Sequence, residues 1–131
     1  MDSTNTRRVT PWGRADFQYI FAPGFAWVNT PGHGGFLIGR RVAKKLLSQA
    51  AIDAGVSFGP FLAYEEDCDA AVIILERLWQ VAPLFLKPKP ELLANVLESL
   101  ARWHPTYVAA SADLIRDIRA AYGIAETPCT P

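Results

Sequence analysis

The chain has 131 residues, of which 50% are hydrophobic, so it can form one domain that buries roughly two thirds of its unfolded surface without disulfides or structural metals. Its 13 lysine and arginine residues balance its 13 aspartate and glutamate residues, and the formal net charge is zero. This balance argues against a basic module that binds polyanions and equally against an acidic mimic of DNA.

The cysteines and the hydropathy pattern bear on the compartment. The first residues do not resemble a secretory signal, and no apolar run approaches the ~20 residues of a membrane helix. The two cysteines, Cys68 and Cys129, lie far apart and lack metal-ligand spacing. We therefore expect a cytoplasmic protein without membrane contact, in which Cys68 is a small core residue.

The N-terminal third predicts strands. Residues 1–10 are polar and aperiodic, which is typical of a flexible lead-in. Residues 14–21 then alternate between apolar and polar side chains, and after the turn pair Pro23-Gly24 two apolar runs follow, at residues 25–29 and 36–38. The short connections predict a three-stranded antiparallel meander whose aromatic face must be covered.

Helices are expected to supply that cover. We predict about four of them, over residues 40–54, from Tyr64 to about Trp79, over residues 90–103, and from the N-cap Ser111 to Gly123. The predicted buried stripes are Ala43, Leu46, Leu47, Ala50, Ala51 and Ala54 on the first helix, Cys68, Ala71, Val72, Leu75, Leu78 and Trp79 on the second, Leu92, Leu93, Val96, Leu97 and Leu100 on the third, and Leu114, Ile115, Ile118 and Tyr122 on the fourth.

Glycine and proline residues mark the expected ends of these elements. Gly55 suits the cap of the first helix, and residues 56–63 read as an apolar connector broken by Gly59-Pro60. The fold class is thus α+β, in a single domain over residues 11–124, with residues 125–131 as a loose tail.

A glycine-rich turn, Thr30 to Gly35, is the most distinctive feature. Its three glycines suit a backbone with positive φ or a close approach by another group. Its one titratable side chain is that of His33, and imidazole titrates near physiological pH. This turn is the candidate site.

The acidic cluster Glu65, Glu66 and Asp67 is the possible counterpart of His33. A histidine with carboxylates can bind a divalent metal or act in general acid–base catalysis, although at most two consecutive carboxylates can point the same way. Alternatively, the acids cap a helix and receive backbone amides of the turn, while His33 holds the loop by a hydrogen bond. A third interpretation is a partner-binding surface made of His33, Gly34, Gly35, Tyr64, Glu65, Glu66 and Asp67.

His104 and the basic residues of the first predicted helix are less specific indications of function. His104 precedes a proline and fits a helix end, where its charge complements the helix dipole. The first helix carries like charges at i, i+4 spacing that could contact phosphates or simply face solvent, and three of them join the candidate partner surface: Arg41, Lys44 and Lys45. Nucleic-acid binding ranks lowest because the net charge is zero.

Five short motifs follow one another in a characteristic order and spacing: Trp12-Gly13, Pro23-Gly24, Thr30-Pro31-Gly32-His33-Gly34-Gly35, Tyr64-Glu65-Glu66-Asp67 and Trp103-His104-Pro105. Over about residues 11–108 they resemble a family of small uncharacterised proteins, a domain of unknown function found on proteobacterial plasmids, phages and other mobile elements. The resemblance implies a setting in mobile elements and supplies no catalytic assignment.

We therefore expect a small accessory protein of a mobile element that binds a macromolecular partner, as an anti-defence inhibitor or a regulatory component. The alternative is a metal-assisted enzyme of the hydrolase type, centred on His33, Glu65, Glu66 and Asp67. We expect no cofactor and no resident metal, and a protein partner ahead of a nucleic acid. The sequence does not determine the oligomeric state.

Overall fold

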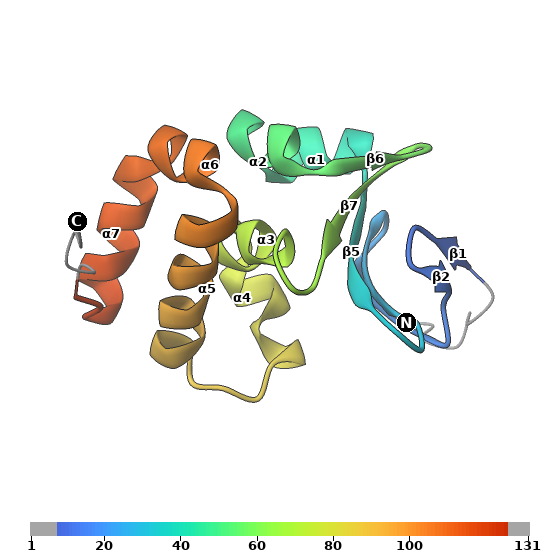
Figure 1. The fold of residues 1–131 in the computed structure, drawn as a ribbon, viewed down its shortest axis with the longest axis horizontal. Coiled ribbons are helices and arrows are strands. Elements are labelled where there is room, and N and C mark those ends of the chain that lie inside the picture. The colour runs from blue at the N-terminus through green and yellow to red at the C-terminus, as the bar shows by residue number, and fades with distance from the viewer. Residues whose placement is uncertain (1–7, 126–131) are drawn as a thin grey trace.

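The protein has an α+β fold, as predicted, in the computed structural model, which describes residues 8–125 (Figure 1). A five-stranded antiparallel sheet has the strand order β3-β4-β5-β7-β6, and a separate two-stranded hairpin lies beside it. The strands are Val9–Thr10 (β1), Gly13–Arg14 (β2), Phe17–Ala22 (β3), Phe25–Asn29 (β4), Gly34–Gly39 (β5), Val56–Phe58 (β6) and Phe61–Glu65 (β7).

The predicted three-stranded meander is present as β3, β4 and β5, but the sheet is larger than predicted. The stretch that read as a connector forms a second hairpin, β6–β7, and β7 pairs with β5. Gly59 has φ +56°, a left-handed conformation that glycine adopts at little cost, and it turns the chain between the two strands. The prediction failed because a strand of three residues is too short to show alternation.

Seven α-helices and one 3-10 helix complete the described part of the chain. They are Arg40–Leu46 (α1), Gln49–Ala54 (α2), Ala70–Glu76 (α3), Leu78–Val81 (α4), Ala82–Leu84 (η1), Lys89–Trp103 (α5), Pro105–Ala110 (α6) and Ala112–Tyr122 (α7). Figure 1 shows α3 to α7 on one side of the sheet and the β1–β2 hairpin on the other.

The single helix predicted over residues 40–54 is in fact two helices. Leu47 has extended backbone, and Ser48 then caps α2 by accepting a hydrogen bond from the Ala51 amide at 3.1 Å. The apolar periodicity continues through the break, because Ala43, Leu47 and Ala51 are all buried. The pattern therefore located the buried face and missed the interruption.

The helix predicted from Tyr64 is wrong at its start. Tyr64 and Glu65 belong to β7, a turn follows, and α3 begins only at Ala70. Its predicted end fails too: α3 stops after Glu76, and Trp79 in α4 is 73% exposed. The Nζ atom of Lys89 lies 4.3 Å from the centroid of the Trp79 ring.

The two later helices match the prediction better. α5 buries all five predicted residues and ends before His104. α7 follows Ser111 and ends at Gly123, whose φ of +65° closes the helix in the left-handed region. Of its predicted stripe, Ile115 is buried while Leu114 is exposed. The short helix α6 was not predicted.

The main core lies between the helices and one face of the sheet, whose central aromatic side chains include Phe25, Trp27 and Phe36. On the other face, a smaller cluster of Ala15, Val28, Leu37 and Ala63 is covered in part by Trp12 of the N-terminal hairpin. The sheet is thus packed on both faces, which fixes the loops at its two ends.

The predicted lead-in and tail fall mainly outside the described residues. Of the lead-in, Val9 and Thr10 are described as β1; the tail, like Cys129, lies outside from residue 126 onward. Within residues 8–125, no helix combines the length and the apolar character needed to cross a membrane.

Candidate functional site

The His33 turn joins β4 to β5 and is fixed by its own polar groups. The Thr30 amide donates to the His33 carbonyl at 2.7 Å. The Thr30 hydroxyl donates to the same carbonyl at 2.8 Å and accepts from the His33 amide at 3.1 Å. These bonds define the backbone at the turn, while the His33 side chain is 53% exposed.

Gly34 and Gly35 follow the turn as buried residues of β5. Neither has positive φ, so conformational freedom is not the reason for glycine at these positions. A Cβ on Gly35 would overlap the Tyr64 carbonyl oxygen and lie 2.6 Å from Cη2 of Trp12. A Cβ on Gly34 would lie 2.7 Å from the Asn29 side chain. Close packing explains both glycines, and neither is an accessible contact for a partner.

The acidic cluster begins at Glu65, the last residue of β7, and continues with Glu66 and Asp67 into the turn before α3, next to His33. The Glu66 amide donates to the Gly34 carbonyl at 2.9 Å, which ties this turn to the start of β5. One ligand atom each of His33, Glu66 and Asp67 lies within 4.8 Å of the others. Glu65 Oε2 lies 4.0 Å from His33 Nδ1. A turn, unlike a helix, lets these consecutive carboxylates approach one imidazole.

Tyr64 belongs to the core and not to the candidate surface. Its hydroxyl donates to the Ala51 carbonyl at 2.7 Å, and the side chain is fully buried. Burial, followed by the negative charge of Glu76, raises the pKa of Tyr64 well above its usual value. The hydroxyl passes Gly55, where a Cβ would lie 2.7 Å from it. The glycine predicted as a helix cap is therefore also required for this contact.

A groove lies between α3 and α5 and opens beside the acidic cluster. It has a volume of about 580 Å³. Its lining residues are Glu66, Asp67, Ala71, Ile74, Leu84, Phe85, Leu86, Lys87, Leu92, Asn95, Val96 and Ser99. Leu86 is fully exposed, at 101%. Sequence reasoning missed this groove because its walls come from two helices and a loop whose packing no local pattern encodes.

The groove has two different ends. Asp67 also lines a small hollow with Arg102 and Trp103, so the acids lie near the C-terminal end of α5. Lys87 precedes the N-terminus of α5 and lies at the other end. The groove is therefore acidic at one end, basic at the other and apolar between them.

His104 is separate from the His33 cluster. Its Nε2 lies 2.8 Å from Asp69 Oδ1, and the two side chains are only 15% and 17% exposed. Its amide donates to the Leu100 carbonyl at the end of α5, so its predicted place at a helix end is confirmed. The pair fastens α5 to the segment before α3.

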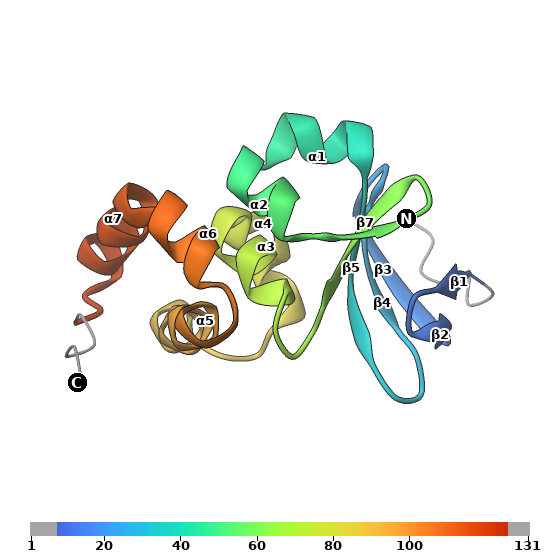
Figure 2. The same ribbon diagram turned by 45° about the horizontal axis from the view of Figure 1, so that its top comes forward.

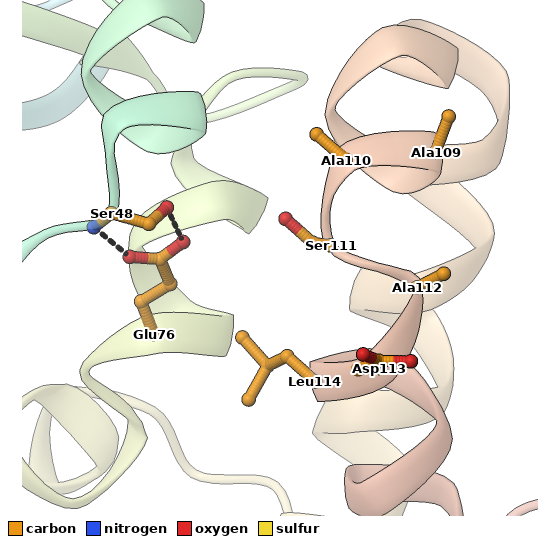
Figure 3. A pocket seen from close by; sticks show the side chains of 8 residues that line it. All are labelled: Ser48, Glu76, Ala109, Ala110, Ser111, Ala112, Asp113 and Leu114. Atoms are coloured by element: carbon orange, nitrogen blue, oxygen red, sulfur yellow. Dashed lines mark hydrogen bonds between the residues drawn. The ribbon is translucent and has the colours of Figure 1, made fainter.

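A third polar cluster, around Glu76, was not predicted, and Figure 3 shows the part of it in which Glu76 meets Ser48. The Glu76 carboxylate accepts from the Ser48 amide at 2.8 Å, the Ser48 hydroxyl at 2.6 Å and the Tyr107 hydroxyl at 2.6 Å. Burial and the bond to Glu76 raise the pKa of Tyr107 well above its usual value. A hollow of about 550 Å³ lies beside Glu76, but this carboxylate already has three donors. The cluster connects α2, α3 and α6.

Cys68 borders the acidic cluster, where its thiol donates to Glu65 Oε1 at 3.8 Å, whereas the basic residues of α1 lie outside the candidate site. Cys68 is half-buried in the turn before α3 and not in a helix, and burial, together with Asp69, raises the pKa of its thiol to about 11. Arg41, Lys44 and Lys45 are exposed on α1. Figure 2 shows α1 and the β4–β5 loop at opposite ends of the sheet. Because a strand rises about 3.3 Å per residue, β5 separates them by roughly 17 Å.

Comparison with known proteins gives a family and no activity. A family model described as Domain of unknown function (DUF7007) matches residues 5–121. No curated protein and no solved structure matches the chain.

Proposed function

We propose that this chain, which belongs to the family described as Domain of unknown function (DUF7007), is an accessory protein that acts by binding a protein partner in the groove between α3 and α5. The groove, with a fully exposed leucine at its rim, is the observation that carries this proposal. We further propose that the protein works in the cytoplasm for a mobile element, as an anti-defence inhibitor or a regulator. The motif resemblance supports the mobile-element setting, and the hydropathy pattern with the two separate cysteines supports the cytoplasm.

The apolar part of the groove supports protein binding. Its apolar lining includes Ala71 and Ile74 of α3 and Leu92 and Val96 of α5. Leu86 also lines the groove, and its side chain is fully exposed to solvent. Burying a leucine side chain contributes about 1.5–3 kcal/mol, so an apolar residue of the partner that covers Leu86 would gain substantial binding energy. Exposed apolar surface next to a groove is typical of interaction sites.

The charges at the two ends support a specific orientation of the partner. Glu66 and Asp67 favour a basic group at one end, and Lys87 favours an acidic group at the other. From Leu92 to Ser99 the groove follows α5 for about 10 Å, since a helix rises 1.5 Å per residue. This length suits about two turns of an amphipathic helix with opposite charges at its ends.

The same charges disfavour nucleic acid at this site. Phosphates would meet the carboxylates of Glu66 and Asp67, whereas the exposed basic residues of α1 lie at the other end of the sheet. A nucleic acid that contacted α1 would leave the groove empty. A protein segment therefore fits the groove better than a phosphate backbone does.

The test uses a charge placed in the apolar rim. Leu86→Asp changes a fully exposed side chain and should leave the fold intact. Val56→Asp is the matched control, because Val56 is also exposed, at 55%, but lies on the edge strand β6. Partners captured by the wild-type protein in its host would be identified, purified and titrated against all three proteins.

We expect Leu86→Asp to lose at least tenfold in affinity, equivalent to about 1.4 kcal/mol, while Val56→Asp binds as the wild type does. A partner that binds the two variants equally well would show that the groove is not the binding site. A partner lost only with Val56→Asp would place the interface at the sheet edge.

A further inference from the structure

We propose that His33, Glu66 and Asp67 form a binding site for a divalent transition-metal ion. One imidazole nitrogen and one oxygen from each carboxylate lie within 4.8 Å of one another. Ligand atoms that share an ion at bond lengths of about 2.0–2.2 Å stand roughly 3–4 Å apart. The three side chains are exposed, so rotation about their own bonds can close the remaining distance.

The backbone already holds the two contributing loops together. β5 and β7 pair with Gly35 opposite Glu65, directly beside the site. The Glu66 amide then donates to the Gly34 carbonyl, one residue after His33. His33 and the two acids therefore start from strands in fixed register, and an ion would have to order only side chains.

The carboxylates of Glu66 and Asp67 differ from that of Glu65, which accepts a hydrogen bond from the Cys68 thiol at 3.8 Å. In the part of the chain that the structure describes, no hydrogen bond or ion pair engages the carboxylate of Glu66 or Asp67. Asp69 and Glu76, on the same stretch of chain, differ from them: the first is paired with His104 and the second has three donors. Two adjacent negative charges repel each other, and a bound cation would relieve that repulsion.

The donor set indicates which ions fit. One imidazole nitrogen with two carboxylate oxygens suits zinc or manganese, whereas calcium and magnesium prefer sites made of oxygen alone. With three ligands from the protein, such an ion keeps at least one position for water. The site has no thiolate, because Cys68 is not a member of the cluster.

The experiment is a titration of the purified chain, freed of any histidine tag, with zinc chloride and manganese chloride. Calorimetry and the Mn²⁺ spin-resonance signal report binding directly, and the melting temperature should rise with ion concentration. The variants are His33→Ala and the double variant Glu66→Gln, Asp67→Asn. The control is the double variant Asp113→Asn, Asp117→Asn, which removes two exposed acids from α7.

We expect saturable binding of one ion per chain by the wild type and by the control. Each site variant should bind at least tenfold more weakly, since even residues outside the ligand shell change metal affinity by about 10–100-fold. Far-UV circular dichroism will show that each variant is folded. No saturable binding up to about 1 mM, or equal affinity in all four proteins, would overturn the proposal. The groove is not involved in this readout, because no partner is present.

Discussion

The two histidines of the chain both face carboxylates of one short segment, residues 65–69, but they differ in contact distance and in burial. His104 meets Asp69 at 2.8 Å, with both side chains largely buried. His33 stays 4.0 Å from Glu65, with about half of its side chain in solvent. One end of the segment is thus bonded to the helical layer, and the other end stands open beside the β4–β5 loop.

This difference separates structural polar groups from available ones. A buried histidine–carboxylate pair stabilises the fold because each partner satisfies the other. An exposed cluster contributes little to folding and keeps its atoms for a ligand. The open end of the segment, next to the groove, therefore presents the atoms that a ligand can reach. Four measurements test whether the two ends differ in this way.

Gly35→Ala should cost the most stability of the four variants, because Gly35 packs where β5 and β7 pair, beside the open end of the segment. Gly35→Ala would place a Cβ against the Tyr64 carbonyl and Trp12, and the β5–β7 pairing would have to shift. We expect a loss of about 2–3 kcal/mol in the free energy of unfolding, measured by chemical denaturation. Gly32→Ala is the control, because a Cβ there meets nothing within 4 Å and φ is not positive. Equal stability of the two variants would refute the close-packing explanation.

The bonded end is tested by His104→Ala. The change leaves the largely buried carboxylate of Asp69 without its imidazole partner, so we expect a loss of about 1–2 kcal/mol. Urea denaturation at pH 7 measures this loss. A stability within about 0.3 kcal/mol of the wild type would show that the contact between His104 and Asp69 contributes nothing to the fold.

Burial, together with the charge of Glu76, raises the pKa values of two tyrosines, Tyr107 and Tyr64. The free energy of unfolding should therefore depend on pH in the alkaline range. Tyr64 and Tyr107 have folded-state pKa values raised above the unfolded value of about 10, so their stabilising contribution is complete below pH ~10 and falls as the pH rises further. Each contributes a slope of about −1.4 kcal/mol per pH unit there.

Tyr107→Phe should cost about 1 kcal/mol at pH 8, through the lost bond to Glu76, and should then have the shallower decline above pH 10. The stability curves of variant and wild type should therefore converge near pH 11. Cys68, whose pKa is raised to about 11, contributes equally to both proteins and cancels in the difference. Parallel curves up to pH 11 would mean that the Tyr107 hydroxyl ionises as easily in the folded protein as in the unfolded one.

His33→Ala should change the stability least of the four variants. The side chain is exposed, and its Nδ1 lies 4.0 Å from the nearest Glu65 carboxylate oxygen, so the free energy of unfolding should change by less than about 0.5 kcal/mol. Thermal and urea denaturation without added metal will show this. If the variant loses as much stability as His104→Ala does, the two histidines have the same structural role and the open end of the segment is not a site.

The sequence predicted those elements in which local pattern and tertiary packing agree. α5 has a complete apolar stripe and a proline boundary, and its limits were found to within a residue. β4 and β5 are apolar runs beside clear turns. The helix predicted from Tyr64 failed because the apolar run from Ala70 to Leu75 is buried on all sides, so it shows no period that would locate the start of the helix.

The candidate site was predictable only in part. The glycine-rich turn and the acidic residues were noticed by composition, but their proximity depends on the pairing of β5 with β7, two strands separated by α1 and α2. The same pairing turns Tyr64 and Gly35 inward. In a strand, successive side chains point to opposite faces of the sheet. Because β7 was not recognised as a strand, Tyr64 and Gly35 were predicted to share one surface with the acidic residues.

The contact between Gly55 and Tyr64 restricts which residues can occupy positions 55 and 64 together. A Cβ at position 55 would lie 2.7 Å from the hydroxyl oxygen and 2.8 Å from Cζ of Tyr64, so neither tyrosine nor phenylalanine at 64 is compatible with alanine at 55 without a shift. Among relatives of this chain, a residue larger than glycine at position 55 should therefore be accompanied by a shorter side chain at position 64. These positions, nine apart and in different elements, should change together during evolution and identify the α2–β7 packing from sequences alone.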